Sequence, residues 1–460
     1  MQIYLNNSLA KTKEEFQPIK NNQVGLYTCG PTVYDYPHIG NWRSYITWDI
    51  LKRFFLSQNF QVNHVMNATD VGHLVSDDDF GEDKLAKAAK REGKNAWEIA
   101  EFFLQVFKVG LKDLNILEPS HLVRATDTVA EQIEFVKILE DKGFLYKTSD
   151  GLYFDTAKII DYGKIANIQN IDLQEGARVE KNLEKKNITD FAVWKFSPAD
   201  QKRDMEWESP WGKGFPGWHL ECSVMSRMYL GDTFDIHTGG IDHLAIHHPN
   251  EMAQSEAVTG KLQARFWLHN EFLKFEGGKM SKSAGTFVTL ENLKEKNISA
   301  LAYRYFVLLT HYRKSLNFSW EALEAAQNAL VNLVKTIASF KDGGKADQVS
   351  LDKFYSALAD DLNTPQAVAV LQEVLASDLT DQDKLATIYQ MDEVLGLDLK
   401  NLKNQILNLS AEVNDLLSQR EQARNNKDWA LSDALRVRLQ SLGVEVEDTA
   451  SGQKAMRLKI

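Results

Sequence analysis

Apolar residues in the first third of the chain fall into short runs that alternate with longer periodic stretches. The apolar run at 24–29 predicts a buried strand, and residues 61–68 predict a second one. Between them a helical pattern starts at Asn41, and further helices are predicted over 84–117 and 128–142. Strands that alternate with helices in this way are typical of an α/β fold.

Two later stretches depart from this alternation. Between 144 and 202 a predicted hairpin and a later strand indicate a small α+β unit inserted into the main sheet. After about 317 the pattern is helical and indicates an antiparallel bundle, followed from about 401 by a last unit of two helices and a small hairpin. The bundle helices are predicted over 320–340, 351–359, 364–376 and 384–395, and the last two over 410–424 and 428–442.

The composition describes an ordinary globular protein with a large core. Of its 460 residues 43% are hydrophobic and 25% are charged, and the net charge is −11. This charge argues against a surface that binds nucleic acid everywhere, although it allows local basic faces. The first twenty residues show no apolar signal segment, and no run of about 18 apolar residues predicts a membrane span. We therefore expect a cytoplasmic protein whose two cysteines do not form a structural disulfide.

The loop after the first predicted strand combines features of a phosphate site. Gly30, Pro31, Pro37 and Gly40 separate the strand from the helix that begins at Asn41. A strand, a Gly/Pro loop and a helix in this order favour an anion at the helix N-terminus. The loop also carries a candidate metal ligand and a candidate phosphate donor, which are Cys29 and His38. An ordinary turn with a buried cysteine would fit the loop alone equally well.

A second segment, 219–251, holds five of the eleven histidines and the only other cysteine. Pro249 suits the first residue of a helix that runs to about 258, where Gly260 would stop it. Because helical side chains tilt toward the N-terminus, Glu251 would point back toward His247. Cys222, His247 and Glu251 form a plausible zinc set to which Cys29 would add a fourth ligand. A solvated helix start is the alternative for His247 and Glu251 alone.

A third segment predicts a basic loop. Lys279 and Lys282 lie three residues apart between glycines and serines, which suits contact with a polyphosphate. An ordinary exposed loop is the alternative.

Taken together, these segments resemble a known family. His38-Ile-Gly-Asn41 and Lys279-Met-Ser-Lys-Ser283 are similar to the paired signature of class I aminoacyl-tRNA synthetases. Three further segments narrow the resemblance to the cysteine–tRNA ligases, and 417–447 resembles the C-terminal domain of that family. They read Tyr-Thr-Cys-Gly-Pro-Thr-Val-Tyr-Asp at 27–35, Pro-Gly-Trp-His-Leu-Glu-Cys-Ser at 216–223 and Phe-Asp-Ile-His at 234–237.

The resemblance implies a fold and its divisions. The expected fold is a Rossmann-like nucleotide-binding parallel sheet, split by an insertion and followed by a helical bundle and a small α(+β) anticodon-binding domain. The expected regions are the first catalytic half at 1–125, the inserted domain at 126–205, the second catalytic half at 206–275, a signature-loop and stem-contact region at 276–316, the bundle at 317–400 and the anticodon-binding domain at 401–460.

The resemblance also implies roles for particular residues. Zinc would be held by Cys29, Cys222, His247 and Glu251, and catalysis would involve His38, Asn41, Lys279 and Lys282. Contacts to ATP or the amino acid carry over to Gly30, Thr32, Gly40, Thr69, Trp218, His237, Asp242 and Lys282. Two positions depart from the family: Asn41 stands where histidine is usual, and Pro249 stands where an acidic residue is usual.

The implied activity is ATP-dependent ligation of L-cysteine to its tRNA through cysteinyl-adenylate, with one zinc ion per chain selecting the thiol and Mg²⁺ accompanying ATP. The expected partners are tRNA for cysteine, L-cysteine and ATP, with no membrane, and the expected state is a monomer. Several arginines lie close together near the C-terminus, and we expect Arg420, Arg424 and Arg436 to contact tRNA, although a solvated helix pair would also fit them. Two competing functions are a cysteine ligase with a small amino-sugar acceptor and a non-catalytic RNA-binding paralogue.

Overall fold

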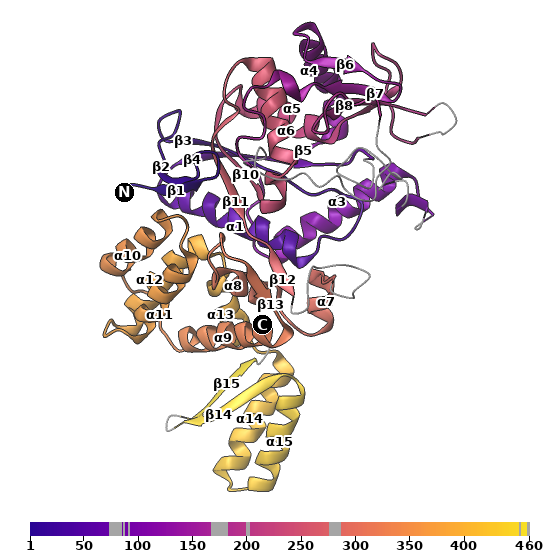
Figure 1. The fold of residues 1–460 in the computed structure, drawn as a ribbon. Helices are drawn as coiled ribbons and strands as arrows, with labels where there is room; N and C mark the ends of the chain where they lie inside the picture. Colours follow the sequence, from indigo (N-terminus) through magenta and orange to yellow (C-terminus); the bar gives the residue numbers. More distant parts are fainter. Residues whose placement is uncertain are drawn as a thin grey trace.

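The computed structural model describes residues 1–72, 85, 88–90, 93–166, 183–198, 203–275, 287–449 and 452–457 (Figure 1). Within these ranges no helix has the length and apolar character needed to cross a bilayer.

The centre of the molecule is a five-stranded parallel sheet. Its first strand in the chain is β3 (Gln23–Thr28), which lies in the middle between β10 and β4. The chain therefore leaves β3 in one direction and returns on its other side, which makes the carboxyl end of β3 a topological switch point where ligands bind in such sheets. The order across the sheet is β11 (Ala264–Asn270), β10 (Phe234–Gly240), β3, β4 (Gln61–Ala68) and β5 (His121–Arg124).

Helices cover both faces of this sheet (Figure 1). On one face α1 (Ile39–Ser57) packs against residues such as Leu26, and on the other face α5 (Trp218–Leu230) and α6 (His247–Thr259) pack near Tyr27. Leu26 and Tyr27 are neighbours in β3, so the alternation of a strand separates the two cores. Also part of this half are α3 (Ala96–Asp113) and α4 (Val129–Asp141).

The prediction of one continuous helix over 84–117 is wrong, because residues 85 and 88–90 are helical but a turn at 93–95 separates them from α3. Gly93 has a positive φ of 65°, and α3 begins only after Asn95, whose side chain accepts a hydrogen bond from the backbone N–H of Glu98. Glu98 in turn accepts from the backbone N–H of Asn95. This capping box fixes a new helix start within the predicted stretch.

The inserted unit contains a four-stranded antiparallel sheet. It confirms the predicted hairpin and the strand over 191–196. The last strand, β9, pairs with β8 and lies beyond residue 205, where the insertion was expected to end. The strands are β6 (Leu145–Lys147), β7 (Gly151–Phe154), β8 (Phe191–Phe196) and β9 (Gly214–Pro216).

A helical bundle follows and shares a continuous core with α1. Two short elements join it to the sheet: β12 (Leu273–Phe275) pairs in parallel with β13 (Leu316–Phe318), and α7 (Leu290–Glu295) lies between them in the chain. An N-terminal hairpin of β1 (Tyr4–Asn7) and β2 (Thr12–Glu15) lies beside β11. The bundle helices are α8 (Ala300–Leu308), α9 (Trp320–Ala338), α10 (Gln348–Ala359), α11 (Thr364–Ala376), α12 (Asp381–Leu395) and α13 (Leu399–Leu407).

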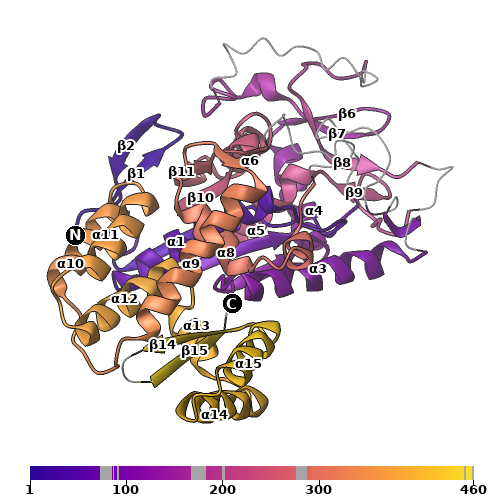
Figure 2. The ribbon, with the colours of Figure 1, turned by 90° about the horizontal axis from the view of Figure 1, so that it is seen from below.

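The last unit projects from the bundle beside α13 (Figures 1 and 2). It consists of α14 (Ala411–Asn425), α15 (Trp429–Ser441) and an antiparallel hairpin of β14 (Val444–Thr449) and β15 (Gly452–Arg457). Because Leu399, Leu402 and Ile406 of α13 are buried in the bundle core, that core continues past the expected boundary at 401. The expected class, an α/β parallel sheet with helical C-terminal domains, is confirmed.

Candidate metal and nucleotide site

The N-terminus of α1 is held by a capping box between two expected catalytic residues. Nδ1 of His38 accepts a hydrogen bond from the backbone N–H of Asn41, and Oδ1 of Asn41 accepts one from the backbone N–H of His38, both at 3.1 Å. Asn41 therefore fixes the helix start. Burial lowers the pKa of His38, so its ring is neutral near pH 7, and with Nδ1 accepting, its proton lies on Nε2. Nε2–H can donate to an anion, and the positive end of the α1 dipole favours one there, although the N–H groups of Ile39 and Asn41 already donate to Val288 and His38.

The loop between β3 and α1 closely approaches the backbone at the end of β4. A Cβ on Gly30 would lie 1.8 Å from the carbonyl oxygen of Asn67, so only glycine fits there. The Gly30 N–H donates to Oδ1 of Asn67 at 2.7 Å, and Thr32 forms a parallel bridge with Thr69. The Thr69 hydroxyl donates to Oε2 of buried Glu221 at 2.8 Å. The structure thus brings the expected Gly30, Thr32 and Thr69 together, and it adds Glu221, which the sequence analysis missed.

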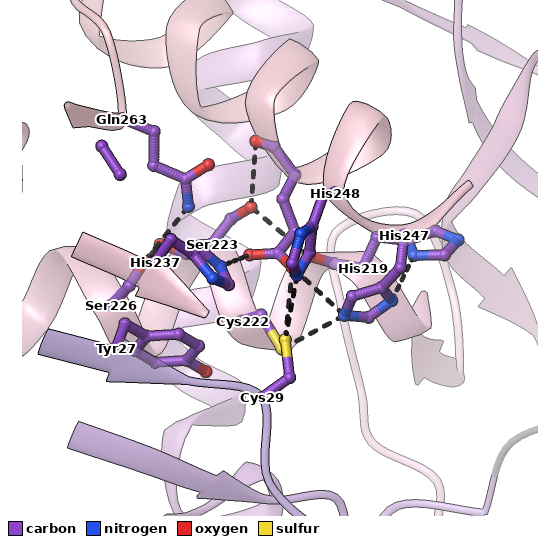
Figure 3. Close-up of polar contacts among 12 residues, drawn as sticks. Tyr27, Cys29, His219, Cys222, Ser223, Ser226, His237, His247, His248 and Gln263 are labelled. Atoms are coloured by element: carbon purple, nitrogen blue, oxygen red, sulfur yellow. Dashed lines mark hydrogen bonds and ion pairs between the residues drawn. The ribbon is translucent and has the colours of Figure 1, made fainter. Parts of the chain in front are cut away.

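Four expected ligands converge at the carboxyl end of β3. Figure 3 shows three of them, Cys29, Cys222 and His247, pointing toward one another. One donor atom from each of Cys29, Cys222, His247 and Glu251 lies within 4.8 Å of the other three. Nε2 of His247 is 3.4 Å from Sγ of Cys222 and 3.2 Å from Oε1 of Glu251, and Sγ of Cys29 is 3.8 Å from the same oxygen. All four residues are buried.

Three separate elements deliver these ligands. Cys29 directly follows β3, Cys222 lies in the second turn of α5, and His247 begins α6. Glu251 is one turn after His247, so both side chains lie on one face of α6. The predicted start of this helix at Pro249 is wrong, because α6 begins two residues earlier, at His247. As the third residue Pro249 still costs no internal hydrogen bond, since the N–H groups of the first turn have no partner within the helix. Gly260 ends α6 in a left-handed conformation, as predicted.

The chemistry of this pocket fits a zinc ion. Burial raises the pKa of Cys29 well above its ordinary value and also raises the pKa of Cys222. The neighbouring acidic groups, including Glu251, raise the pKa of each thiol further, because they would repel its thiolate. A divalent cation would remove this penalty, and two thiolates, an imidazole and a carboxylate are ligands that zinc prefers.

A second group of possible ligands overlaps the first. Cys29 and Glu251 also lie within 4.8 Å of donor atoms on His237 and His248. Nε2 of His237 is 2.9 Å from Oε2 of Glu251, and Nε2 of His248 is 3.4 Å from Sγ of Cys29. The expected substrate contact His237 therefore touches a proposed ligand. His248 was missed, although its place beside His247 was a signal.

Further histidines extend the cluster on two sides. Nδ1 of His219 lies 2.8 Å from Nδ1 of His247. On the opposite side Nδ1 of His248 lies 2.7 Å from Nε2 of His269, a residue of β11. Such outer contacts fix the ring orientation of a metal-ligating histidine.

Other expected site residues lie at the edge of the cluster or beyond it. Trp218 begins α5, and its ring packs edge-on against His247 with 5.7 Å between centroids. The Asp242 side chain is 63% exposed and 3.9 Å from Nε2 of His243. Gly40 lies in the first turn of α1.

Lys279 and Lys282 lie outside the described residues. The structure does describe the chain on either side of that segment. β12 ends at Phe275, and the chain is described again from Phe287, whose ring lies 5.5 Å from that of His38. Thr289 forms an antiparallel bridge with His38. The chain that follows the two lysines therefore lies against the start of α1.

The three expected tRNA-contacting arginines converge on one carboxylate, Asp448 in β14. Arg420 is 1% exposed, and its two Nη atoms donate to the two oxygens of Asp448 at 2.9 Å each. Arg424 and Arg436 donate to Oδ2 at 2.9 and 2.8 Å. Arg420 is thus a correction to the expectation, because a buried guanidinium needs its carboxylate and cannot face tRNA. The other two side chains are 35% and 38% exposed.

Comparison with known proteins agrees with this geometry. Residues 15–328 match the model of the class I (C) tRNA synthetase catalytic domain, 353–400 match a DALR domain, and 408–454 match the cysteinyl-tRNA ligase anticodon-binding domain. The chain is 47% identical over 455 residues to cysteine–tRNA ligase 1 of Burkholderia lata, covering 99% of this chain and 97% of that protein. The chain belongs to the cysteine–tRNA ligase family.

Other cysteine–tRNA ligases are similar over their whole length. The Treponema denticola protein is 42% identical over 484 residues, covering 98% of both chains. Among solved structures, Mycobacterium tuberculosis methionyl-tRNA synthetase bound by methionyl-adenylate aligns with a TM-score of 0.55 at 17% identity, over 89% of this chain and 96% of that one. The Agrobacterium radiobacter LeuRS–tRNA–LeuAMS complex aligns with a TM-score of 0.59 at 12% identity, over 84% and 85%. These two structures share the fold.

Proposed function

We propose that this chain activates L-cysteine with ATP as cysteinyl-adenylate and transfers the cysteinyl group to tRNA. Membership of the cysteine–tRNA ligase family supports the overall reaction. The observation that carries the finer assignment is the buried set of Cys29, Cys222, His247 and Glu251 at the carboxyl end of β3, in which Cys29 lies on the same loop as His38.

In the first step a carboxylate oxygen of cysteine attacks the α-phosphorus of ATP, and the bond from that phosphorus to the bridging oxygen breaks to release pyrophosphate. Charge builds on the phosphate oxygens, so catalysis requires positioned donors. Nε2–H of His38 is such a donor, held in place by the capping box with Asn41, and the positive end of the α1 dipole favours the same charge. Lys279 and Lys282 would contact the leaving pyrophosphate, and Mg²⁺ would accompany ATP.

The metal site would select the amino acid. When bound, zinc supplies a soft Lewis acid that favours the thiol of cysteine, as its thiolate, over the hydroxyl of serine. Cys29, Cys222, His247 and Glu251 would hold it, and His237 would orient the carboxylate of Glu251 through its 2.9 Å contact. A site built around one specific group can discriminate by about 10⁴ or more without a separate editing step.

In the second step the hydroxyl of the terminal tRNA ribose attacks the acyl carbon of the adenylate, and AMP leaves. The match of 408–454 to the cysteinyl-tRNA ligase anticodon-binding domain supports tRNA as the acceptor. The same match disfavours an amino-sugar acceptor, which would not need such a domain.

The experiment is cysteine-dependent exchange of pyrophosphate into ATP, followed by charging of transcribed tRNA on the same preparation, with metal content measured alongside. We expect exchange with cysteine but not serine, charging of the tRNA with a cysteine anticodon, and about one zinc per chain. Cys222→Ala should lose most of the zinc, whereas Ser8→Ala, outside the four ligands, should retain it. Full zinc occupancy in the Cys29→Ala, Cys222→Ala double variant would overturn the metal assignment, and absence of exchange would overturn the activation step.

A further inference from the structure

Two exposed aromatic rings lie side by side next to the signature loop. Tyr36 is 42% exposed and Phe102 is 41% exposed, and their centroids are 6.3 Å apart with the rings perpendicular. Tyr36 belongs to the loop between β3 and α1, and Phe102 lies in the second turn of α3. Segments far apart in sequence therefore build one aromatic surface, which we name the Tyr36–Phe102 shelf.

The Tyr36–Phe102 shelf packs on a buried aromatic ring, and a lysine side chain lies over it. The Tyr36 ring packs edge-on against buried Phe103, with 5.2 Å between centroids and an angle of 86°. Nζ of Lys94, a residue in the turn before α3, lies 4.8 Å from the centroid of Phe102. The carboxylate of Glu101, the neighbour of Phe102, is paired with Arg124 at 2.9 Å. An exposed aromatic pair with a cation over one of its rings suits a partner with flat rings and negative charge.

The position of the shelf narrows the partner further. Tyr36 is two residues before His38, but the rings face different neighbours: His38 lies against Phe287 and caps α1, whereas Tyr36 lies against α3. The shelf is thus next to the proposed adenylate site without being part of it. A tRNA can react there only if its unpaired 3′ end passes the entrance of that site.

We propose that the Tyr36–Phe102 shelf stacks an unpaired base at the 3′ end of the tRNA, with Lys94 contacting a neighbouring phosphate. This inference rests on the proposed charging of tRNA and adds a binding surface to it. Stacking on aromatic side chains is the usual way in which proteins bind single-stranded nucleotides, and it is worth about 1–3 kcal/mol per base. The terminal ribose would be guided toward the acyl group by a surface that tolerates any base sequence.

The test measures binding of two RNAs by the full-length protein: complete tRNA, and the same tRNA lacking its unpaired 3′ nucleotides. Phe102→Ala should weaken binding of complete tRNA by about tenfold, because about 1.4 kcal/mol of stacking is lost. Binding of the shortened tRNA should stay within about twofold of wild type. Phe102→Trp should retain binding of complete tRNA, since it keeps an aromatic face. Val109→Ala, which changes an exposed side chain two turns further along α3, is the matched control.

Tyr36→Leu provides a second variant that keeps bulk but removes the ring. It should show the same selective loss as Phe102→Ala, whereas Tyr36→Phe should not. Equal loss on both RNAs, or no loss on either, would overturn the proposal. Because pyrophosphate exchange needs no tRNA, its failure in wild type would count against the proposed activation and not against the shelf.

Discussion

A buried ion pair joins the helix that carries the signature to the helical bundle. Asp49 of α1 has no exposed side-chain area, and its Oδ2 accepts from Nη2 of Arg304 at 2.6 Å and from Nε of Arg53 at 2.8 Å. Arg304 is also fully buried and donates to the carbonyl of Leu395 at the end of α12, at 2.7 Å, and to that of Leu114 at 3.0 Å. This ion pair therefore connects α1 with the end of α3 and with the bundle.

Asp49→Asn should be strongly destabilising. The amide keeps an oxygen for the N–H of Leu117, which Oδ1 accepts at 2.9 Å, but its NH₂ group cannot accept from a guanidinium. Arg304 would remain buried with carbonyl partners alone, and breaking a buried pair in this way costs about 3–5 kcal/mol. The exposed pair Lys13–Asp360, with side chains 46% and 58% exposed, provides the control, because Asp360→Asn should cost about 0–1 kcal/mol.

The assay is urea unfolding of both variants and wild type, monitored by tryptophan fluorescence. Hydrogen exchange of peptides from α1 is measured separately in the absence of urea. Asp49→Asn should lower the free energy of unfolding by about 3–5 kcal/mol and speed exchange in α1 at least a hundredfold. An effect no larger than that of Asp360→Asn would refute the reasoning.

The pH dependence gives an independent check. Burial raises the pKa of Asp49, but Arg304 and Arg53 outweigh it, so the pKa is lowered in the folded protein. The stabilisation is therefore complete above about pH 4, the ordinary value for an aspartate, and is lost as the pH falls through the lower folded value. The difference between wild type and Asp49→Asn should narrow as the pH drops below about 4.

Three further predictions concern adenylation, tRNA charging and the fold of the last unit. Lys282→Ala should lower the single-turnover adenylation rate more than it weakens cysteine binding, because its charge would act mainly in the transition state; an unchanged rate would contradict this. A protein ending at residue 408, after α13, should keep pyrophosphate exchange but lose most tRNA charging efficiency, and equal charging would count against the tRNA role of the last unit. Arg420→Ala should unfold the last unit, as measured by exchange in α14, whereas Arg436→Ala should leave it folded and flatten the salt dependence of tRNA binding.

Local patterns were sufficient to predict most elements of the fold. The strand at 61–68 and the helix at 364–376 match the structure at both ends, because apolar periodicity and the flanking turn residues agree there. The start of α3 was missed because the helical composition of 84–117 hid a Gly-Lys-Asn turn, and only the reciprocal contacts of Asn95 and Glu98 reveal it. Element ends are thus decided by single hydrogen bonds that composition does not record.

In the functional site, too, the sequence predicted some residues and missed the contacts of others. Cys29, Cys222, His247 and Glu251 were predicted together because their residue types and the family pattern agree, and the structure gathers them in one buried cluster. Contacts between distant segments could not be predicted, since no spacing in the sequence shows that Glu221 of α5 contacts Thr69 after β4. The same limit explains the arginines of the last unit: charge density suggested a surface, but burial of Arg420 depends on where Asp448 lies in three dimensions.

The order of residues along one crossover links amino-acid selection to the chemistry. Cys29 directly follows the central strand and His38 caps the helix nine residues later, so one metal donor and the phosphate donor lie at the two ends of one short loop. Under the proposed function, a cysteine held through its sulfur at the metal cluster would present its carboxylate toward the start of α1, where the α-phosphate would lie. Serine could not be held in this way, so its carboxylate would reach the phosphate without fixed orientation. Positioning of reacting groups is a large part of the barrier reduction that enzymes achieve. A single recognition event at the sulfur would therefore determine both which amino acid binds and whether its carboxylate reacts.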